Sequence, residues 1–287
     1  FSPRANVENT AQQARKICIV TPNYLSSTPR VVKEADALHE AGFEVRVVFS
    51  QGNLENVRVH DAELLKGKGW TPQTFGWSPH RPQEKWRYHG SRYRHFAARK
   101  LPAALWSLPY VVETAEGRVY PELARLAAAE PADLYIGHYL DGLAAAAYAA
   151  RRWNALLGYD AEDLHTEFGD DEVIKKRAFT LEQRYIVRCA HVTAASELMA
   201  QNLSQKYHIP PPTPIYNVFP WSDRDHLDGA IKDRRADALS IYWYSQTIGL
   251  DRGIQDAIRA MGLVDAPVQL HLRGALSPDV QQALLAL

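Results

Sequence analysis

The chain has 287 residues, of which 46 % are hydrophobic, and its 33 basic side chains balance 33 acidic ones. This length and apolar fraction support a buried core in one large domain or two modest ones. With a net charge of zero, no long-range field favours nucleic acid as a partner, and we expect none. Two distant cysteines without a CxxC pair fit a reducing, cytoplasmic compartment.

The N-terminal part predicts a strand, a helix and a second strand. Residues 1–15 are polar and form an extension, and the apolar run 16–20 predicts the first strand. The pair Thr28-Pro29 has the cap-then-proline order of a helix start, and Gly42 marks the helix end. Residues 43–49 alternate into the second strand. The turn before the helix holds no G-x-G-x-x-G sequence, so the fingerprint of a nicotinamide-binding domain is absent.

Residues 53–99 are rich in Trp, His, Arg, Pro and Gly and show no clear hydrophobic period. The segment 81–100 contains seven Lys or Arg and a single acid, Glu84, with aromatic side chains interleaved. One interpretation is a surface excursion whose aromatic rings cover the edge of a sheet. The alternative is a basic, aromatic lip that contacts an anionic membrane or a charged acceptor. No run approaches the roughly 18 apolar residues that a membrane span needs.

Residues 132–168 are the centre of the predicted fold. An apolar strand at 134–136 precedes an Ala-rich helix at 142–153, for which Asp141 is the predicted N-cap, and a second strand follows at 155–159. Such a unit has parallel strands, and ligands bind at the carboxyl ends of parallel strands. We therefore expect one imidazole and three carboxylates to share that edge of the sheet: His138, Asp160, Glu162 and Asp163.

The rest of the chain continues the α/β pattern. Helices are predicted at 171–190 and at 197–207, where Ser196 is the cap, with strands at 191–195 and 215–218. A strand, a helix and a strand recur after a charged linker. We predict an α/β fold of Rossmann-like parallel sheets in four parts: an extension at 1–15, an N-terminal domain at 16–222, a linker at 223–238 and part of a second domain at 239–287.

Four stretches carry a family resemblance by their order and spacing. They are Pro29-Arg30-Val31 through Val45; 133–163 with Tyr159-Asp160-Ala161-Glu162-Asp163-Leu164; 193–203 with Tyr216-Asn217; and 242–260. On these residues the chain resembles retaining glycosyltransferases of family 4, which have the GT-B fold of two facing Rossmann-like domains. There are departures, since the loop 22–27 lacks the family's glycines and Ser245-Gln246 stands where the family has Gly-Arg. The family's paired glutamates would fall beyond Leu287, so we expect an incomplete form with weak donor binding and little transfer.

The resemblance implies roles for particular residues. His138 would be the catalytic residue at the donor sugar, although a lone histidine is more often structural. Arg252 would bind the donor diphosphate, although it also reads as a solvated residue at a helix start. Further donor-binding candidates are Gln246, Gly249 and Asn217. Acceptor-side candidates are Arg30, Asn23, Tyr24, Asp160 and Glu162; an ordinary surface ion pair is the alternative for Arg30.

The resemblance also implies the partners of the chain. The donor would be a nucleotide sugar, the acceptor a glycan, a lipid or a small molecule, and the setting polysaccharide biosynthesis in the cytoplasm. Segment 81–100 would contact the inner face of the membrane. We expect no metal or other cofactor, because no His or Cys stands at ligand spacing around the acids and GT-B enzymes are usually metal-independent. Two alternatives stay open, a GT-B nucleotide-sugar epimerase and a non-catalytic module that binds a sugar or nucleotide.

Overall fold

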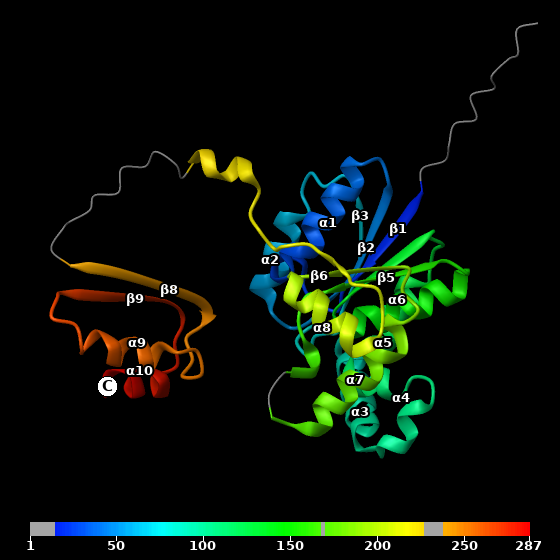
Figure 1. Ribbon diagram of the computed structural model, residues 1–287. Coiled ribbons are helices and arrows are strands. Elements are labelled where there is room, and N and C mark those ends of the chain that lie inside the picture. Colours follow the sequence, from blue (N-terminus) through cyan, green and yellow to red (C-terminus); the bar gives the residue numbers. More distant parts are fainter. Residues whose placement is uncertain (1–14, 168–169, 227–237) are drawn as a thin grey trace, which may run out of the picture. The chain divides into compact units, whose positions relative to one another are not determined.

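The computed structural model describes residues 15–167, 170–226 and 238–287, and the chain divides into two compact units after Val218. A parallel sheet is the centre of the first unit (Figure 1). Its strands lie in the order β3-β2-β1-β4-β5-β6-β7, which confirms the predicted α/β class. The strands are β1 (Lys16–Val20), β2 (Glu44–Gln51), β3 (Thr71–Gly76), β4 (Leu134–His138), β5 (Leu156–Ala161), β6 (His191–Ala194) and β7 (Thr213–Pro214).

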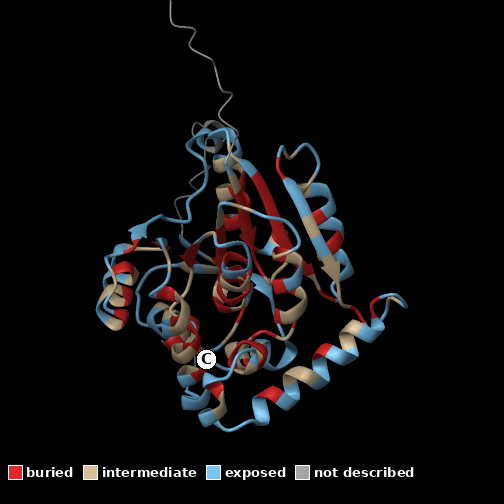
Figure 2. Cartoon of the chain, turned by 90° about the vertical axis from the view of Figure 1, so that its right-hand side faces the viewer, coloured by how far each residue is buried: buried red, intermediate tan, exposed pale blue. Residues whose placement is uncertain are grey.

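Helices cover both faces of this sheet, so its central strands are buried on both sides (Figure 2). On one face Ile17 and Ile19 pack against Val31 of the first helix. On the other face Cys18 and Val20 belong to the larger core that later helices complete. The helices are α1 (Pro29–Glu40), α2 (Glu55–Leu64), α3 (Lys85–Lys100), α4 (Val111–Glu116), α5 (Tyr120–Ala127), α6 (Tyr139–Trp153), α7 (Glu172–Ile186) and α8 (Glu197–Tyr207).

Most of the predicted helix ends are confirmed. Pro29 opens α1, and Gly42 follows its end with φ of 90°, a conformation that suits glycine. The Ser196 hydroxyl accepts a hydrogen bond from the Met199 amide at the start of α8. The predicted cap Asp141 is wrong, because α6 begins at Tyr139 and Asp141 lies inside its first turn.

The predicted strand at 215–218 is also wrong. The last strand of the sheet is the short β7, which ends at Pro214. The side chains of Ile215 and Val218 are exposed. Their apolar and β-branched character suggested a strand. The Ile215 amide still donates to the Ala194 carbonyl of β6 at 2.8 Å, but the described ladder does not continue beyond it.

The segment 53–99, which shows no clear hydrophobic period in the sequence, contains α2, β3 and most of α3. Helix α3 buries only the small side chains Ser91 and Ala98, so no apolar stripe reveals it in the sequence. Trp86, Tyr93 and Phe96 are exposed on it, whereas the ring of Tyr88 stacks on Trp77, directly after the edge strand β3. Among the described residues, no helix is both long and apolar enough to cross a membrane.

Helix α6 lies unusually close to the sheet. A Cβ atom on Gly137, in β4, would come within 2.4 Å of the Leu143 Cα atom. A Cβ atom on Gly142, in α6, would come within 2.5 Å of the Val20 carbonyl oxygen in β1. Both contacts are with backbone, so two glycines allow the first turn of α6 to lie directly on the carboxyl ends of β1 and β4.

The second unit contains β8 (Leu239–Thr247), α9 (Ile254–Met261), β9 (Val268–Ala275) and α10 (Pro278–Leu285). Its two strands pair in parallel, as the strand–helix–strand pattern predicts. Ser277 caps α10 through the amide of Val280. Most side chains of β8 are exposed, whereas Ile248 and Ile254 are buried. Much of the predicted linker at 223–238 lies outside the described residues.

Candidate functional site

The carboxyl ends of β4 and β5 bring a histidine and two acids together. His138 ends β4 and is the register partner of Asp160 in β5, and its side chain is fully buried. The imidazole lies between two carboxylates. Its Nδ1 atom is 2.8 Å from Glu162 Oε1, and its Nε2 atom is 2.7 Å from Glu34 Oε2. Because a carboxylate only accepts hydrogen bonds, both ring nitrogens donate, as in an imidazolium ion.

The pKa of His138 agrees with this protonation state. Burial alone would lower the pKa, since it disfavours the charged ring. The hydrogen bonds to Glu162 and Glu34 and the charges of Glu34 and Asp160 act in the opposite direction. They raise the pKa of His138 from 6.5 to about 10, so the imidazole is a cation at neutral pH.

A buried ion pair adjoins the histidine. The Arg30 guanidinium of α1 donates to both oxygens of Asp160, with 2.6 Å between Nη2 and Oδ1, and also to the Ile215 carbonyl. The Thr193 hydroxyl of β6 donates to Asp160 as well. Burial would raise the pKa of Asp160, but Arg30, His138 and Thr193 together hold it below its ordinary value. One carboxylate thus joins α1, β4, β5, β6 and the segment after β7.

Only part of this cluster meets solvent. The side chains of Glu34 and Glu162 are 23 % and 13 % exposed, whereas His138 is 0 % exposed. Two pockets of the first unit, one beside α3 and one at the amino ends of the sheet, are lined by other residues. A ligand at this edge would therefore meet the two glutamates first, with the imidazolium behind them.

Three of these residues place possible metal ligands near one another. Ligand atoms of His138, Asp160 and Glu162 lie within 4.8 Å of one another, which is close enough to surround an ion. However, a protonated imidazole has no lone pair for a metal, and Arg30 engages both oxygens of Asp160. In the described structure these side chains therefore bond to one another as an ion-pair cluster.

The other candidates of the first unit lie around the cluster or away from it. Asn23 hydrogen bonds to Tyr139, whose hydroxyl lies 3.3 Å from Glu162 Oε2. Tyr24 is turned away, since its hydroxyl accepts from the Leu54 amide at 2.9 Å. Asn217 is exposed beyond β7, and its side-chain oxygen accepts a hydrogen bond from Lys33 of α1 at 3.1 Å.

The remaining donor-binding candidates belong to the second unit. Arg252 precedes α9, and its guanidinium donates to the Ser245 hydroxyl at 3.1 Å. Gln246 is exposed near the end of β8. Gly249 lies in the turn between them, where a Cβ atom would come within 2.7 Å of an Asp251 carboxylate oxygen. The three candidates thus share the turn from β8 to α9.

Three residues of the cluster are missing from the sequence-based set. Glu34 lies four residues after Arg30 on α1, so the two share a helix face, and this spacing is a usable signal. Thr193 stands opposite Asp160 in the register of β5 and β6, which only the structure reveals. Tyr139 follows His138 directly, with a left-handed φ of 59° that turns the chain into α6.

Comparisons with known proteins agree with this architecture. The glycosyl transferase 4-like domain model matches residues 27–217. No curated protein matches the chain. Among solved structures, HepE of Anabaena in complex with UDP and glucose is 14 % identical, with a TM-score of 0.54 over 95 % of this chain and 65 % of its own.

Two further structures have the same fold. UGT89C1 of Arabidopsis thaliana is 10 % identical, with a TM-score of 0.51 over 94 % of this chain and 72 % of its own. The lipopolysaccharide outer core galactosyltransferase WaaB is 11 % identical, with a TM-score of 0.50 over 94 % of this chain and 64 % of its own. At these identities the likeness concerns the fold alone, and the chain spans about two thirds of HepE. The match across residues 27–217 places the chain in the family of glycosyl transferase 4-like domains, with the GT-B fold of glycosyltransferases.

Proposed function

We propose that the chain transfers a sugar from a nucleotide-sugar donor to a glycan, a lipid-linked acceptor or a small molecule, with retention at the anomeric carbon. The observation that carries this proposal is the family match over residues 27–217, which contain the whole charged cluster around His138. The neighbour HepE, whose structure holds UDP and glucose, supports a nucleotide sugar as the donor.

The cluster suits the charge that develops during transfer. Positive charge grows on the sugar ring as the nucleoside diphosphate departs. Negatively charged groups fixed nearby stabilise this charge and so lower the barrier. The carboxylates of Glu34, Asp160 and Glu162 outnumber the two cations, Arg30 and His138, by one. Because Glu34 and Glu162 form the accessible side, the proposed role of His138 is to hold these two carboxylates in place.

The departing diphosphate needs donors of hydrogen bonds. We assign this role to the turn from β8 to α9, where Arg252, Gln246 and Gly249 precede a helix N-terminus. Asn217 is the proposed donor-side residue of the first unit. Arg30 and Asp160 support the proposed acceptor side from within, and Glu162 and Asn23 lie beside it. Tyr24 is not part of it, because its hydroxyl is turned toward the Leu54 amide. No step requires a metal, so we propose transfer without one.

The test is release of nucleoside diphosphate from a panel of nucleotide sugars in EDTA, with the anomeric configuration of the product read by NMR. In His138→Ala, kcat should fall at least tenfold while KM changes little, because the cluster acts on the transition state. Glu34→Gln should behave in the same way. Glu40→Gln is the matched control, since it removes an exposed carboxylate from the same helix.

The outcomes separate the possible functions. Binding of a nucleoside diphosphate without release from any nucleotide sugar would contradict transfer and leave a binding module. An inverted product would contradict retention alone. Equal activity of His138→Ala and Glu40→Gln would show that the cluster has no part in the reaction.

We also propose that α3 contacts an anionic membrane and so meets a lipid-linked acceptor at its cytoplasmic face. Trp86, Tyr93 and Phe96 are 66 %, 72 % and 61 % exposed and lie at helical spacing on one stripe. Arg92 and Arg99 flank this stripe. Rings that enter the headgroup region beside cations are typical of interfacial helices.

Co-sedimentation with vesicles that contain phosphatidylserine tests this contact. The double variant Arg92→Gln, Arg99→Gln should bind less than the wild type, and the difference should vanish with neutral vesicles. Arg125→Gln removes an exposed cation from α5 and serves as the control. Equal partition of all three proteins would refute the proposal.

A further inference from the structure

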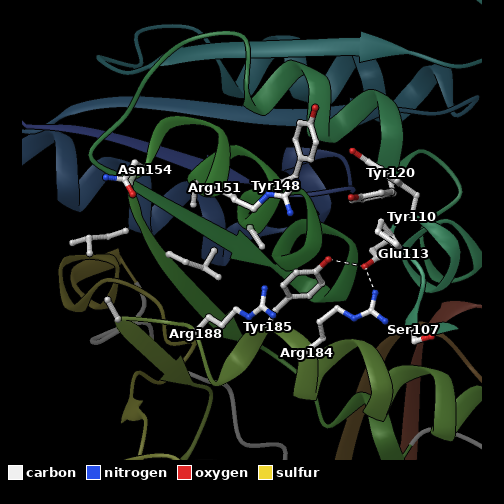
Figure 3. Close-up of a pocket in the computed structure, with 17 residues that line it drawn as sticks. Ser107, Tyr110, Glu113, Tyr120, Tyr148, Arg151, Asn154, Arg184, Tyr185 and Arg188 are labelled. Carbon is white, nitrogen blue, oxygen red and sulfur yellow. Dashed lines mark hydrogen bonds and ion pairs between the residues drawn. The ribbon is translucent and has the colours of Figure 1, made fainter.

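A pocket of about 500 Å³ lies at the amino ends of β5 and β6, at the edge of the sheet opposite to His138 (Figure 3). Leu156 and Leu157 begin β5 there, and Ala190 directly precedes β6. In the same strand Asp160 lies three residues beyond Leu157, which is about 10 Å. The pocket is therefore separate from the charged cluster, and its volume is that of a small-molecule site.

Aromatic rings form one wall of this pocket. The ring of Tyr110 lies 6.1 Å from that of Tyr120 and 6.2 Å from that of Tyr148, measured between centroids. Tyr110 has a φ of 68°, a left-handed conformation that is unfavourable for a tyrosine by roughly 1–2 kcal/mol. The residue is half exposed, so a ligand can reach its ring. Side chains of leucine and alanine complete an apolar surface on which a flat ring can stack.

A buried glutamate fixes the opposite wall. Glu113 of α4 is 1 % exposed, and its Oε1 atom accepts hydrogen bonds from Arg184 and from the Tyr185 hydroxyl, both at 2.6 Å. These contacts join α4 to α7 and compensate the charge of Arg184. The second oxygen, Oε2, is buried without a hydrogen-bond partner in the described structure. The pocket is thus preformed, and its wall retains an acceptor that the protein does not use.

Two other cations at the pocket are left without such a partner. The guanidinium groups of Arg151, near the end of α6, and Arg188, just after α7, make no hydrogen bond or ion pair with any described residue. Figure 3 shows them reaching toward the cavity from different elements. A guanidinium group presents donors in a planar fork that matches a carboxylate or a phosphate. Two of them beside one apolar cavity favour an anion.

We propose that this pocket binds a small organic anion in which a carboxylate or phosphate is attached to a flat apolar body. The anionic group lies between Arg151 and Arg188, and the body stacks on Tyr110, Tyr120 and Tyr148. This site is independent of the proposed transfer reaction. It lies at the edge of the sheet away from the ends where GT-B ligands are expected.

Calorimetric titration of the full chain with three naphthalene derivatives tests the site. The anions 1-naphthyl phosphate and 1-naphthoate should bind, and neutral 1-naphthol should bind at least tenfold more weakly. The preference between the two anions identifies the headgroup. Arg151→Gln and Arg188→Gln should each weaken binding of the preferred anion at least tenfold. Saturating UDP should leave its affinity unchanged.

Arg152→Gln is the matched control, because Arg152 follows Arg151 but its guanidinium lies 5.0 Å from the Trp153 ring and outside the pocket. Arg152→Gln should bind the preferred anion with the affinity of the wild type, and circular dichroism should be unchanged in all variants. Equal binding of naphthol and the anions would overturn the proposal. So would wild-type affinity in both Arg151→Gln and Arg188→Gln, or no binding of any anion.

Discussion

Cations at the carboxyl ends of the central strands differ in their bonding from two arginines at the amino ends. At the carboxyl ends, Arg30 and His138 are buried and bonded to carboxylates from several elements. At the amino ends, Arg151 and Arg188 border an open pocket without any described partner. A cation that bonds to carboxylates of other helices and strands contributes to stability, whereas a cation without a bonded partner is available to a ligand. Substitution of Arg30 should therefore affect folding, whereas substitution of Arg151 or Arg188 should affect only binding.

The largest effect should follow from Arg30→Met. This change removes the guanidinium that bonds to both oxygens of the buried Asp160, and loss of one partner of a buried pair typically costs about 3–5 kcal/mol. Urea unfolding at pH 7 measures the loss. Lys66→Met removes an exposed pair on the surface and should change the unfolding free energy little. Similar midpoints for both variants would remove the basis of the comparison.

The next effect concerns pH. His138 faces Glu34 and Arg30 from α1 and Asp160 and Glu162 from β5 and its exit, and its pKa is raised from 6.5 to about 10. A raised pKa means that the stabilisation is complete below pH 6.5 and is lost as pH rises toward 10. Between pH 6.5 and 9 the wild type should lose about 3 kcal/mol more than His138→Gln. Parallel curves for the two proteins would mean that the imidazole is neutral in the fold.

A smaller effect is expected at Thr193. Its hydroxyl donates to Asp160, and a hydrogen bond to a charged group contributes about 1.5–3 kcal/mol. Thr193→Val keeps the shape and removes the donor, so unfolding should become easier by about 2 kcal/mol. Thr193→Ser keeps the donor and should recover most of the loss. If both variants lost the same amount, packing of the methyl group would be the cause.

The smallest effect should come from substitution of Arg188, at the amino ends of the strands. Arg188→Gln removes an exposed side chain that bonds to no described residue, so its unfolding free energy should stay within about 0.5 kcal/mol of the wild type. Urea unfolding of Arg188→Gln and Arg30→Met under the same conditions compares the losses of unfolding free energy at the two ends of the strands. A loss above about 2 kcal/mol in Arg188→Gln would show that this edge also depends on its cations.

Much of the sheet could be predicted because its strands are short apolar runs between proline, glycine and capping residues. The gathering of His138, Asp160 and Glu162 at one edge followed from two parallel strands ending together. The partner Glu34 could not be found in this way, since it lies 104 residues before His138 on another element. The burial of His138 behind its carboxylates was equally hidden, because it depends on how α1 packs over the strand ends.

Other elements were missed for a different physical reason. Helix α3 rests on the small residues Ser91 and Ala98 and leaves its large rings exposed, so hydrophobic spacing gives no helix signal. Ile215 and Val218 suggested a strand by residue type, yet the described sheet ends at β7. The pocket at the amino ends of the strands had no sequence signal, since its tyrosines and arginines come from α5, α6, α7 and the turns before α4 and after α7.

The close approach of α6 to the sheet predicts how this region tolerates change under selection. Gly137 and Gly142 leave no room for a Cβ atom, and the obstructing atoms are backbone, which cannot rotate aside. Any replacement would displace the helix start that carries Tyr139 and, through β4, the position of His138. In a library randomised at both positions and selected for folded, active protein, glycine should be recovered at each. Gly137 and Gly142, which have no side chains, would then tolerate substitution as poorly as the charged residues beside them.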